Sequence, residues 1–211
     1  MKIFLFGVTG NAGQAILQEA LSRGHSVTAA ARQTGFFHPV GKANVVTADA
    51  LDTAALKDVI KGHDAVIVAI SGRKSGHKTV ATIATNLLAA MPVAGVSRML
   101  WVGGAGTLEV APGVRLVDTP QFPAAYKEEA LGQGMALQTL RDSDTALNWT
   151  YVSPPAIIGV GARTGTYRIG GDQLLSDAQG NSTISWIDYA VAIVDELEKN
   201  AHPKARITVA Y

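Results

Sequence analysis

Three glycines near the amino end of this chain constrain its fold more than any other feature. Gly7, Gly10 and Gly13 follow the apolar, strand-forming segment 2–6 with the spacing G-x-x-G-x-x-G. The residues after them, 12–21, carry apolar side chains at helical spacing. A strand that runs through a glycine turn into a helix is the context in which a chain can bind a dinucleotide.

Each glycine has a separate physical role in such a turn. One allows the tight turn, one lets the backbone approach a pyrophosphate, and one lets the helix pack closely on the strand. The helix N-terminus adds unpaired N–H groups and a partial positive charge, which favour phosphate. A turn without a ligand would show the same spacing, but the preceding strand and a second strand at 26–31 favour nucleotide binding. The predicted phosphate-binding residues are Gly7, Thr9, Gly10, Asn11, Ala12 and Gly13.

Composition excludes several other kinds of protein. The 211 residues include 18 Lys and Arg and 17 Asp and Glu, without a basic run, so nucleic acid is not expected as a partner. The absence of Cys removes disulfides, thiolate metal sites and a cysteine nucleophile, and no metal site is expected. No apolar run reaches the roughly 18 residues of a membrane span. We expect a cytoplasmic protein, either a monomer or a homodimer, without a membrane partner.

Strand and helix patterns alternate along the whole chain. We expect strands at 2–6, 26–31, 44–48, 65–70, 98–102, 148–152 and 206–210, and helices at 12–21, 53–60, 79–90, 124–141 and 186–198. This alternation predicts an α/β fold, a Rossmann-type doubly wound parallel sheet with strand order 3-2-1-4-5-6, a seventh strand at the edge and helices on both faces. Because no linker interrupts the pattern, residues 1–211 are expected to form a single NAD(P)-binding domain with a small C-terminal substrate-side extension.

Two local signals mark helix ends. The helix at 79–90 is expected to end before Pro92, because proline breaks a helix interior. Ser185, with Asp188 three residues later, is expected to form a capping box at the start of the last helix.

Ligands of such a sheet bind where its parallel strands end. The second strand ends at Arg32, where an acidic residue would favour NAD; arginine suits the 2′-phosphate of NADP, although a solvated loop arginine is the alternative. Asp49 follows the third strand and is expected near the adenine. The glycine pair after the fifth strand would let a flat ring approach closely. The other strand ends expected at this site are Ala69, Ile70 and Ser71, Gly103 and Gly104, and Ser153, Pro154 and Pro155.

Two segments lack a regular pattern. Residues 107–124 contain three prolines, and residues 163–184 contain short strand-like runs and turns. Because long irregular segments of compact domains often cover a binding site, both are expected on the substrate side. The positively charged segment 73–78, Arg73-Lys74-Ser75-Gly76-His77-Lys78, would hold phosphate or flank a substrate, unless it is a solvated loop.

These residues together resemble an atypical short-chain dehydrogenase/reductase, of the NAD(P)H-binding branch that contains NADH-flavin reductases. That branch is related to NmrA-like proteins and to the biliverdin reductase/flavin reductase type. The resemblance covers essentially the whole chain and rests on residues 7–13, Arg32, Asp49, Gly103-Gly104, Ser153-Pro154 and 184–190. It implies an NAD(P)H cofactor, and Arg32 favours NADP(H) over NAD(H).

The chain departs from the wider family at the catalytic pair Tyr-x-x-x-Lys. Here Tyr126 is followed four residues later by Ala130, although Lys127 stands beside the tyrosine. A tyrosine acid normally relies on a nearby cation, so alcohol dehydrogenation is not expected. Hydride transfer to a flavin or quinone depends mostly on positioning, and water can protonate the product. Tyr126 and Ser71 are the candidate catalytic residues.

Three functions are consistent with these observations. The favoured one is an NAD(P)H-dependent reductase that transfers a hydride to a flavin or quinone-like acceptor. The second is a non-catalytic, NAD(P)-sensing regulatory binder of the NmrA type. The third is an epimerase or isomerase with a tightly bound cofactor, against which the missing Tyr-x-x-x-Lys pair counts. The fold alone does not choose among them.

Overall fold

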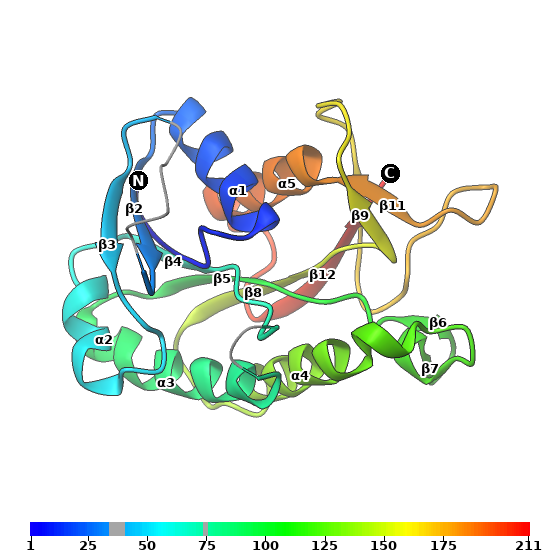
Figure 1. Cartoon of the computed structure of the whole chain (residues 1–211), viewed down its shortest axis with the longest axis horizontal. Coiled ribbons are helices and arrows are strands. Elements are labelled where there is room, and N and C mark those ends of the chain that lie inside the picture. The colour runs from blue at the N-terminus through cyan, green and yellow to red at the C-terminus, as the bar shows by residue number, and fades with distance from the viewer. Residues whose placement is uncertain (34–40, 74–75) are drawn as a thin grey trace.

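A central sheet covered by helices on both faces forms the body of the molecule (Figure 1). The computed structural model describes residues 1–33, 41–73 and 76–211, so Lys74 and Ser75 of the charged segment lie outside the described residues. The large sheet is formed by β1 (Lys2–Phe6), β2 (Ser26–Ala31), β3 (Asn44–Thr47), β4 (Ala65–Val68), β5 (Arg98–Val102), β8 (Asn148–Ser153), β10 (Arg168–Gly170) and β12 (Ala205–Ala210). The α-helices are α1 (Asn11–Ser22), α2 (Thr53–Ile60), α3 (Lys78–Ala94), α4 (Ala124–Arg141) and α5 (Trp186–Lys199).

The strand order confirms the predicted doubly wound topology and extends it by one strand. The order is β10-β12-β8-β5-β4-β1-β2-β3, and every pairing is parallel except that of β10 with β12. The predicted seventh strand, β12, is therefore not at the edge. Residues 168–170 pair antiparallel with residues 208–210 and cover N–H and C=O groups that an edge strand would expose.

The side chains of β1 alternate between two separate apolar cores. Ile3 and Leu5 pack in the core beneath α1 and α5, whereas Phe4 and Phe6 pack in the core on the other face, with α2, α3 and α4. Figure 1 shows α1 and α5 above the sheet and the other three helices below it. Strands buried on both faces require continuous apolar runs, which explains the composition of β1 and β4.

The helix predicted to stop before Pro92 continues to Ala94. Pro92 lies in the last turn and lacks one N–H, so the helix loses a single backbone bond, while the fully buried Met91 holds that turn against the core. Gly95 then ends the helix with a φ of 74°, and the Val96 N–H donates to Met91 O at 3.0 Å. In the described ranges of the chain, none of the helices is both long enough and apolar enough to cross a bilayer.

The two segments expected to be irregular contain short regular elements. Residues 107–124 include the hairpin of β6 (Glu109–Ala111) and β7 (Val114–Arg115) and the short 3-10 helix η1 (Leu116–Asp118). The second segment contributes β10 and also β11 (Thr183–Ser185), which pairs in parallel with β9 (Ile157–Gly159) in a separate small sheet.

Candidate functional site

The glycine turn lies at the carboxyl edge of the sheet, the edge at which β1, β2, β4, β5 and β8 end. Gly7 has a φ of +81°, and a Cβ built on it would lie 2.1 Å from Ala69 O. A Cβ on Gly13 would lie 2.2 Å from Gly7 O. Both glycines are therefore required by backbone packing, the first by the turn and the second by the close contact of α1 with that turn.

Gly10 differs from Gly7 and Gly13 because a side chain at this position would not clash with the backbone. Among the described residues, a Cβ there would contact only Gly7 O, at 3.5 Å, and the φ of −88° and ψ of 164° suit any residue. Gly10 and Asn11 are exposed and Ala12 is half-buried, so this side of the turn faces solvent. The space beside Gly10 fits the approach of a phosphate to the backbone.

The first turn of α1 offers hydrogen-bond donors to that space. The N–H of Gln14 is the first with a helical acceptor, donating to Gly10 O at 2.9 Å. Within the described part of the chain, the N–H groups of Asn11, Ala12 and Gly13 have no acceptor, and no side chain caps the helix. Unpaired N–H groups and the helix dipole together favour an anion at this position.

Arg32 and Asp49 follow β2 and β3 on one side of the glycine turn. Both side chains are exposed. Arg32 has no ion-pair partner among the described residues, so its guanidinium is available to a ligand. One carboxylate oxygen of Asp49 accepts the Leu51 N–H at 3.0 Å, which orients the side chain at the start of the following turn. The adenosine half of a dinucleotide would lie here.

A buried hydrogen-bond network fixes the strand ends on the other side of the turn. Gln133 of α4 donates to Ile70 O at 2.8 Å and accepts the indole N–H of Trp101 at 3.0 Å. Tyr151 donates to Gln133 O at 3.1 Å and accepts the Gly104 N–H at 3.1 Å. Burial raises the pKa of Tyr151 well above its usual range, so the phenol remains a donor. This network joins β4, β5 and β8 to α4, and sequence reasoning missed it because its members lie far apart in the chain.

Gly103 has a different physical role from the one expected. We expected its missing side chain to let a flat ring of a ligand approach. A Cβ on Gly103 would instead lie 2.1 Å from Cε1 of Tyr151, so the phenol ring of this residue occupies the space. At Gly104 the nearest atom to a built Cβ is Gln133 Cβ at 3.3 Å, which again is protein. Both glycines are explained by packing on the network.

The three residues after β8 are less accessible than expected. Ser153 is fully buried, Pro155 is buried and Pro154 is half-buried. In the part of the chain that the structure describes, the Ser153 Oγ has no hydrogen-bond partner. A ligand bound at this edge would contact Pro154 before it could reach Ser153 or Pro155.

Arg73 contacts both candidate catalytic residues, Ser71 through its backbone and Tyr126 through its side chain. Tyr126 lies in the first turn of α4 with 52 % of its surface exposed, and the Arg73 guanidinium carbon stands 5.5 Å from the centre of its ring. The Arg73 N–H donates to the Ser71 Oγ at 3.4 Å, and its Nε donates to Glu129 Oε2 at 2.5 Å. A cation from outside α4, Arg73, thus lies over the tyrosine ring.

Lys127, the residue next to Tyr126, is exposed, and its charge contributes to the surroundings of Asp118 in η1. The pKa of Asp118 is lowered mainly by its hydrogen bonds with Arg115 and, to a smaller extent, by the charge of Lys127.

A buried carboxylate fastens the 163–184 segment to the body of the protein. Asp188 accepts the N–H groups of Thr164 and Gly165, at 3.0 and 2.8 Å, and the Tyr211 hydroxyl at 2.6 Å. Burial alone would raise the pKa of Asp188, but these hydrogen bonds lower it to about 2. The predicted capping box forms only in part. The Asp188 N–H donates to Ser185 Oγ, but the carboxylate accepts hydrogen bonds from the 163–184 segment and not from the N-cap.

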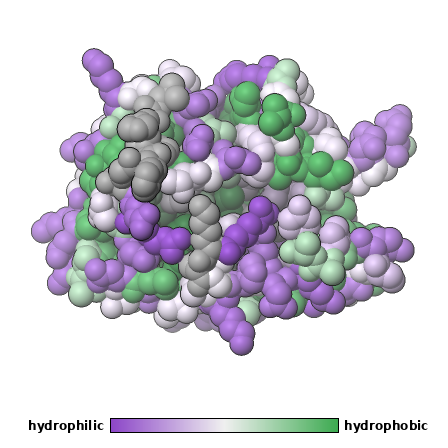
Figure 2. All heavy atoms as spheres, in the orientation of Figure 1, coloured by the Kyte–Doolittle hydropathy of each residue, from purple (hydrophilic) through white to green (hydrophobic). Residues whose placement is uncertain are grey.

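The surface at the carboxyl edge has a hydrophobic part and a hydrophilic part. Figure 2 shows hydrophobic side chains over the region of β9 and β11 and mostly hydrophilic ones over the lower layer that contains α3 and α4. The apolar part includes Ile157 and Val160, which are 64 % and 102 % exposed.

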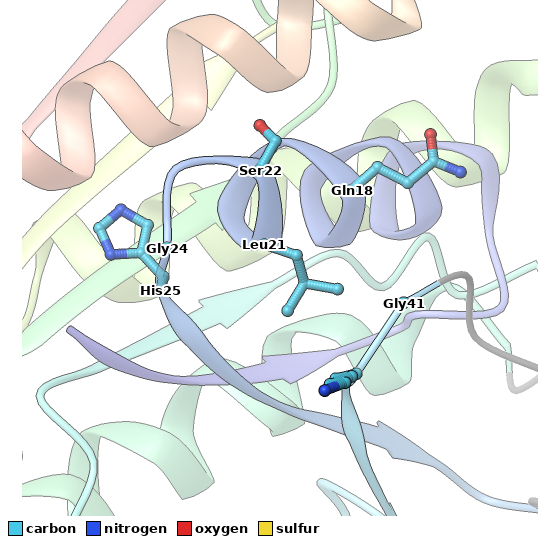
Figure 3. A pocket seen from close by; sticks show the side chains of 7 residues that line it. Gln18, Leu21, Ser22, Gly24, His25 and Gly41 are labelled. Atoms are coloured by element: carbon cyan, nitrogen blue, oxygen red, sulfur yellow. The ribbon is translucent and has the colours of Figure 1, made fainter.

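An open hollow of about 650 Å³ lies away from the glycine turn (Figure 3). It is lined by Gln18, Leu21, Ser22, Gly24, His25, Gly41 and Lys42. These residues stand at the C-terminal end of α1 and the amino ends of β2 and β3, on the opposite edge of the sheet. The His25 ring in it is already paired with Glu198 at 2.8 Å. The candidate site is therefore the carboxyl edge.

Comparison with known proteins finds a matching family and similar solved structures over the length of the chain. The model of a family described as NAD(P)H-binding matches residues 7–200. A structure of a Burkholderia pseudomallei protein, called a "putative exported protein", is 43 % identical with a TM-score of 0.91, and 100 % of each chain is covered. A "putative epimerase" from Bacteroides thetaiotaomicron is 37 % identical, with a TM-score of 0.90 and coverage of 100 % of this chain and 96 % of the other. A "putative NADH-flavin reductase" from Streptococcus pneumoniae is 36 % identical, with a TM-score of 0.88 and coverage of 100 % and 99 %.

Proposed function

This chain belongs to the family of NAD(P)H-binding proteins, and we propose that it is an oxidoreductase that transfers a hydride from NAD(P)H to a flavin or quinone-like acceptor. The observation that carries the cofactor part is the space beside Gly10, next to three N–H groups of α1 that have no acceptor among the described residues. The acceptor class is supported by similarity over nearly the whole chain to the protein from S. pneumoniae.

The residues of the carboxyl edge divide into two groups around the glycine turn. Gly10 and the first turn of α1 would hold the pyrophosphate, and Arg32 and Asp49 would hold the adenosine half. Arg32, which has no ion-pair partner among the described residues, would bind a 2′-phosphate, and this supports a preference for NADP(H) over NAD(H). The nicotinamide would then lie toward Ile70, Ser71 and Gly104. The remaining proposed contacts are Gly7, Thr9, Asn11, Ala12, Gly13, Ala69, Gly103 and Pro154, with the buried Ser153 and Pro155 supporting Pro154 from behind.

The proposed reaction requires the protein to position the two reactants and does not require a side chain to donate the proton. The bound cofactor supplies a hydride, which carries two electrons, and the reduced acceptor takes one proton from water to balance its charge. The buried network of Gln133 and Tyr151 would keep the strand ends fixed beneath the reacting rings, so that positioning supplies most of the catalysis. Tyr126, half exposed beside Arg73, would contact the acceptor and order the water that protonates it.

An epimerase remains the second candidate because the B. thetaiotaomicron relative is named as one. An epimerase of this fold returns its hydride to the substrate and consumes no NADPH. A regulatory binder of the NmrA type would bind the cofactor without turnover. Consumption of NADPH that depends on an added acceptor therefore separates the reductase from both alternatives.

The test follows the NADPH absorbance band with flavin mononucleotide, riboflavin or a quinone as the acceptor. We expect oxidation that requires both the protein and the acceptor. Tyr126→Phe keeps the ring beside Arg73 and removes the hydroxyl, and we expect it to lower kcat by less than about tenfold, because water can supply the proton. A loss of about a thousandfold would instead identify Tyr126 as the essential proton donor.

A cytoplasmic location and a monomeric or homodimeric state belong to the same proposal. NAD(P)H is produced and reused in the cytoplasm, whereas the B. pseudomallei relative is called exported. Cell fractionation with an antibody against this chain, and light scattering of the purified protein, test the two statements.

A further inference from the structure

Arg73 has a contact pattern that no step of the proposed reaction yet uses. Its Nε is bonded to Glu129 Oε2 at 2.5 Å, and its guanidinium stands over the Tyr126 ring at 5.5 Å. The Glu129 side chain is only 18 % exposed, so it is a fixed partner on α4 and not a mobile surface group. The guanidinium is held in place from two sides.

The close approach of two helices brings these residues together. A Cβ on Gly132 of α4 would lie 2.5 Å from His77 O, just before α3, so a larger residue would push the two segments apart. Arg73 precedes α3, and Glu129 and Tyr126 precede Gly132 on α4. The approach permitted by this glycine therefore allows the Arg73 side chain to reach the first turns of α4.

Within the described part of the chain, the two terminal amino groups of the Arg73 guanidinium have no partner. The side chain of Arg73 is 62 % exposed, and among the described residues neither of its two Nη atoms has an acceptor. A guanidinium fixed through its Nε presents its two terminal amino groups as a planar fork, which matches the oxygens of a phosphate or carboxylate. Because Tyr126 and Ser71 lie beside it, this fork is on the acceptor side of the glycine turn, away from Arg32.

We propose that Arg73 is a specificity-determining residue that binds an anionic group of the acceptor. The acceptor class is then a flat, reducible ring that carries a phosphate or carboxylate on a side chain, as flavin mononucleotide does. The Tyr126 ring supports both partners, because it packs on the guanidinium and offers an exposed aromatic face to the ring of the acceptor. This inference rests on the proposed reductase function.

The experiment compares two acceptors that share one ring system. Flavin mononucleotide and riboflavin differ by a phosphate at the end of the same side chain. For the unaltered protein we expect a KM about tenfold lower for flavin mononucleotide, the lower end of the effect of a charged hydrogen bond because Arg73 is mostly exposed. Arg73→Ala should raise the KM for flavin mononucleotide to that for riboflavin, and leave the KM for riboflavin within about twofold.

Two control variants separate a bound anion from a general charge effect. Arg73→Lys keeps the charge but loses the fork, and should keep only part of the preference. Lys61→Ala removes one positive charge at the C-terminal end of α2, at the opposite edge of the sheet, and should keep all of it. Quenching of flavin fluorescence by the protein, without NADPH, should show the same order of affinities.

Four results would overturn this role. If both flavins are reduced with the same KM before and after Arg73→Ala, the reductase stands but Arg73 does not bind the acceptor. If Arg73→Ala raises the KM for NADPH and leaves the flavin preference intact, the guanidinium binds the cofactor. If only a quinone supports NADPH oxidation, the reductase stands but this inference fails; if neither a flavin nor a quinone does, the proposed function fails and this inference fails with it.

Discussion

Adding one methyl group at Gly10 and one at Gly13 should have opposite consequences, although the two glycines are three residues apart in one motif. A Cβ on Gly13 would lie 2.2 Å from Gly7 O and 2.8 Å from Val8 Cα, and both of these are backbone atoms. A Cβ on Gly10 would lie 3.5 Å from Gly7 O, an ordinary contact, on the side of the turn that faces solvent. Gly13→Ala therefore disturbs the fold, whereas Gly10→Ala occupies the space proposed for the pyrophosphate.

The sizes of the two effects follow from these distances. Overpacking against a backbone that must move costs about 3 kcal/mol, of which the better helix propensity of Ala returns about 1. With roughly 2–4 °C per kcal/mol for a chain of this size, Gly13→Ala should lower the Tm by about 4–8 °C. Gly10→Ala exchanges one N-cap residue without a side-chain bond for another, which costs under about 1 kcal/mol and shifts the Tm by under about 4 °C.

Calorimetric titration with NADPH completes the comparison. Gly10→Ala should weaken binding by at least about tenfold, or 1.4 kcal/mol, since a methyl group would stand between the backbone and the phosphates. The reasoning about the site is refuted if folded Gly10→Ala binds NADPH as the unaltered protein does. An unchanged Tm for Gly13→Ala would refute the packing argument.

Two other predictions follow from individual side chains. Arg32→Ala should weaken NADPH binding roughly ten- to a hundredfold and NADH binding far less, because a charged hydrogen bond to phosphate contributes about 1.5–3 kcal/mol; equal losses in titrations would exclude a contact with the 2′-phosphate. Asp188, whose pKa of about 2 lies below its ordinary 3.8, should contribute about 2 kcal/mol of stability above pH 4, and lose it as the pH falls toward 2. The stability lost in Asp188→Asn, measured by urea unfolding, should therefore shrink over that interval; a constant difference would contradict the assignment.

Local signals were sufficient to predict most of the scaffold. The glycine turn, the bounds of α2 and α4, and the order of the seven central strands all follow from patterns within single segments. Hydrophobic periodicity, turn residues and the handedness of crossovers are properties of short stretches, and here they agree with one another.

The differences arise where residues distant in sequence meet. The glycine at 103 is required by the ring of Tyr151, which comes from a strand nearly fifty residues later. The carboxylate of Asp188, a residue in the first turn of α5, accepts the N–H groups of residues 164 and 165. The fork of Arg73 is placed by Glu129 of α4. No local pattern encodes these partners, because each contact depends on how the sheet and helices pack.

The central claim is that this chain passes hydride from NADPH, bound at the glycine turn, to a separate acceptor. Its most direct test is a single-turnover mixing experiment with NADPH and with NADPH deuterated at the transferred position of the nicotinamide, each with flavin mononucleotide present. The account predicts that NADPH is oxidised only when the flavin is added, and that the deuterated cofactor reacts more slowly. Tight binding of NADPH without its oxidation by any flavin or quinone would contradict the claim, and would make the chain a binder or an epimerase.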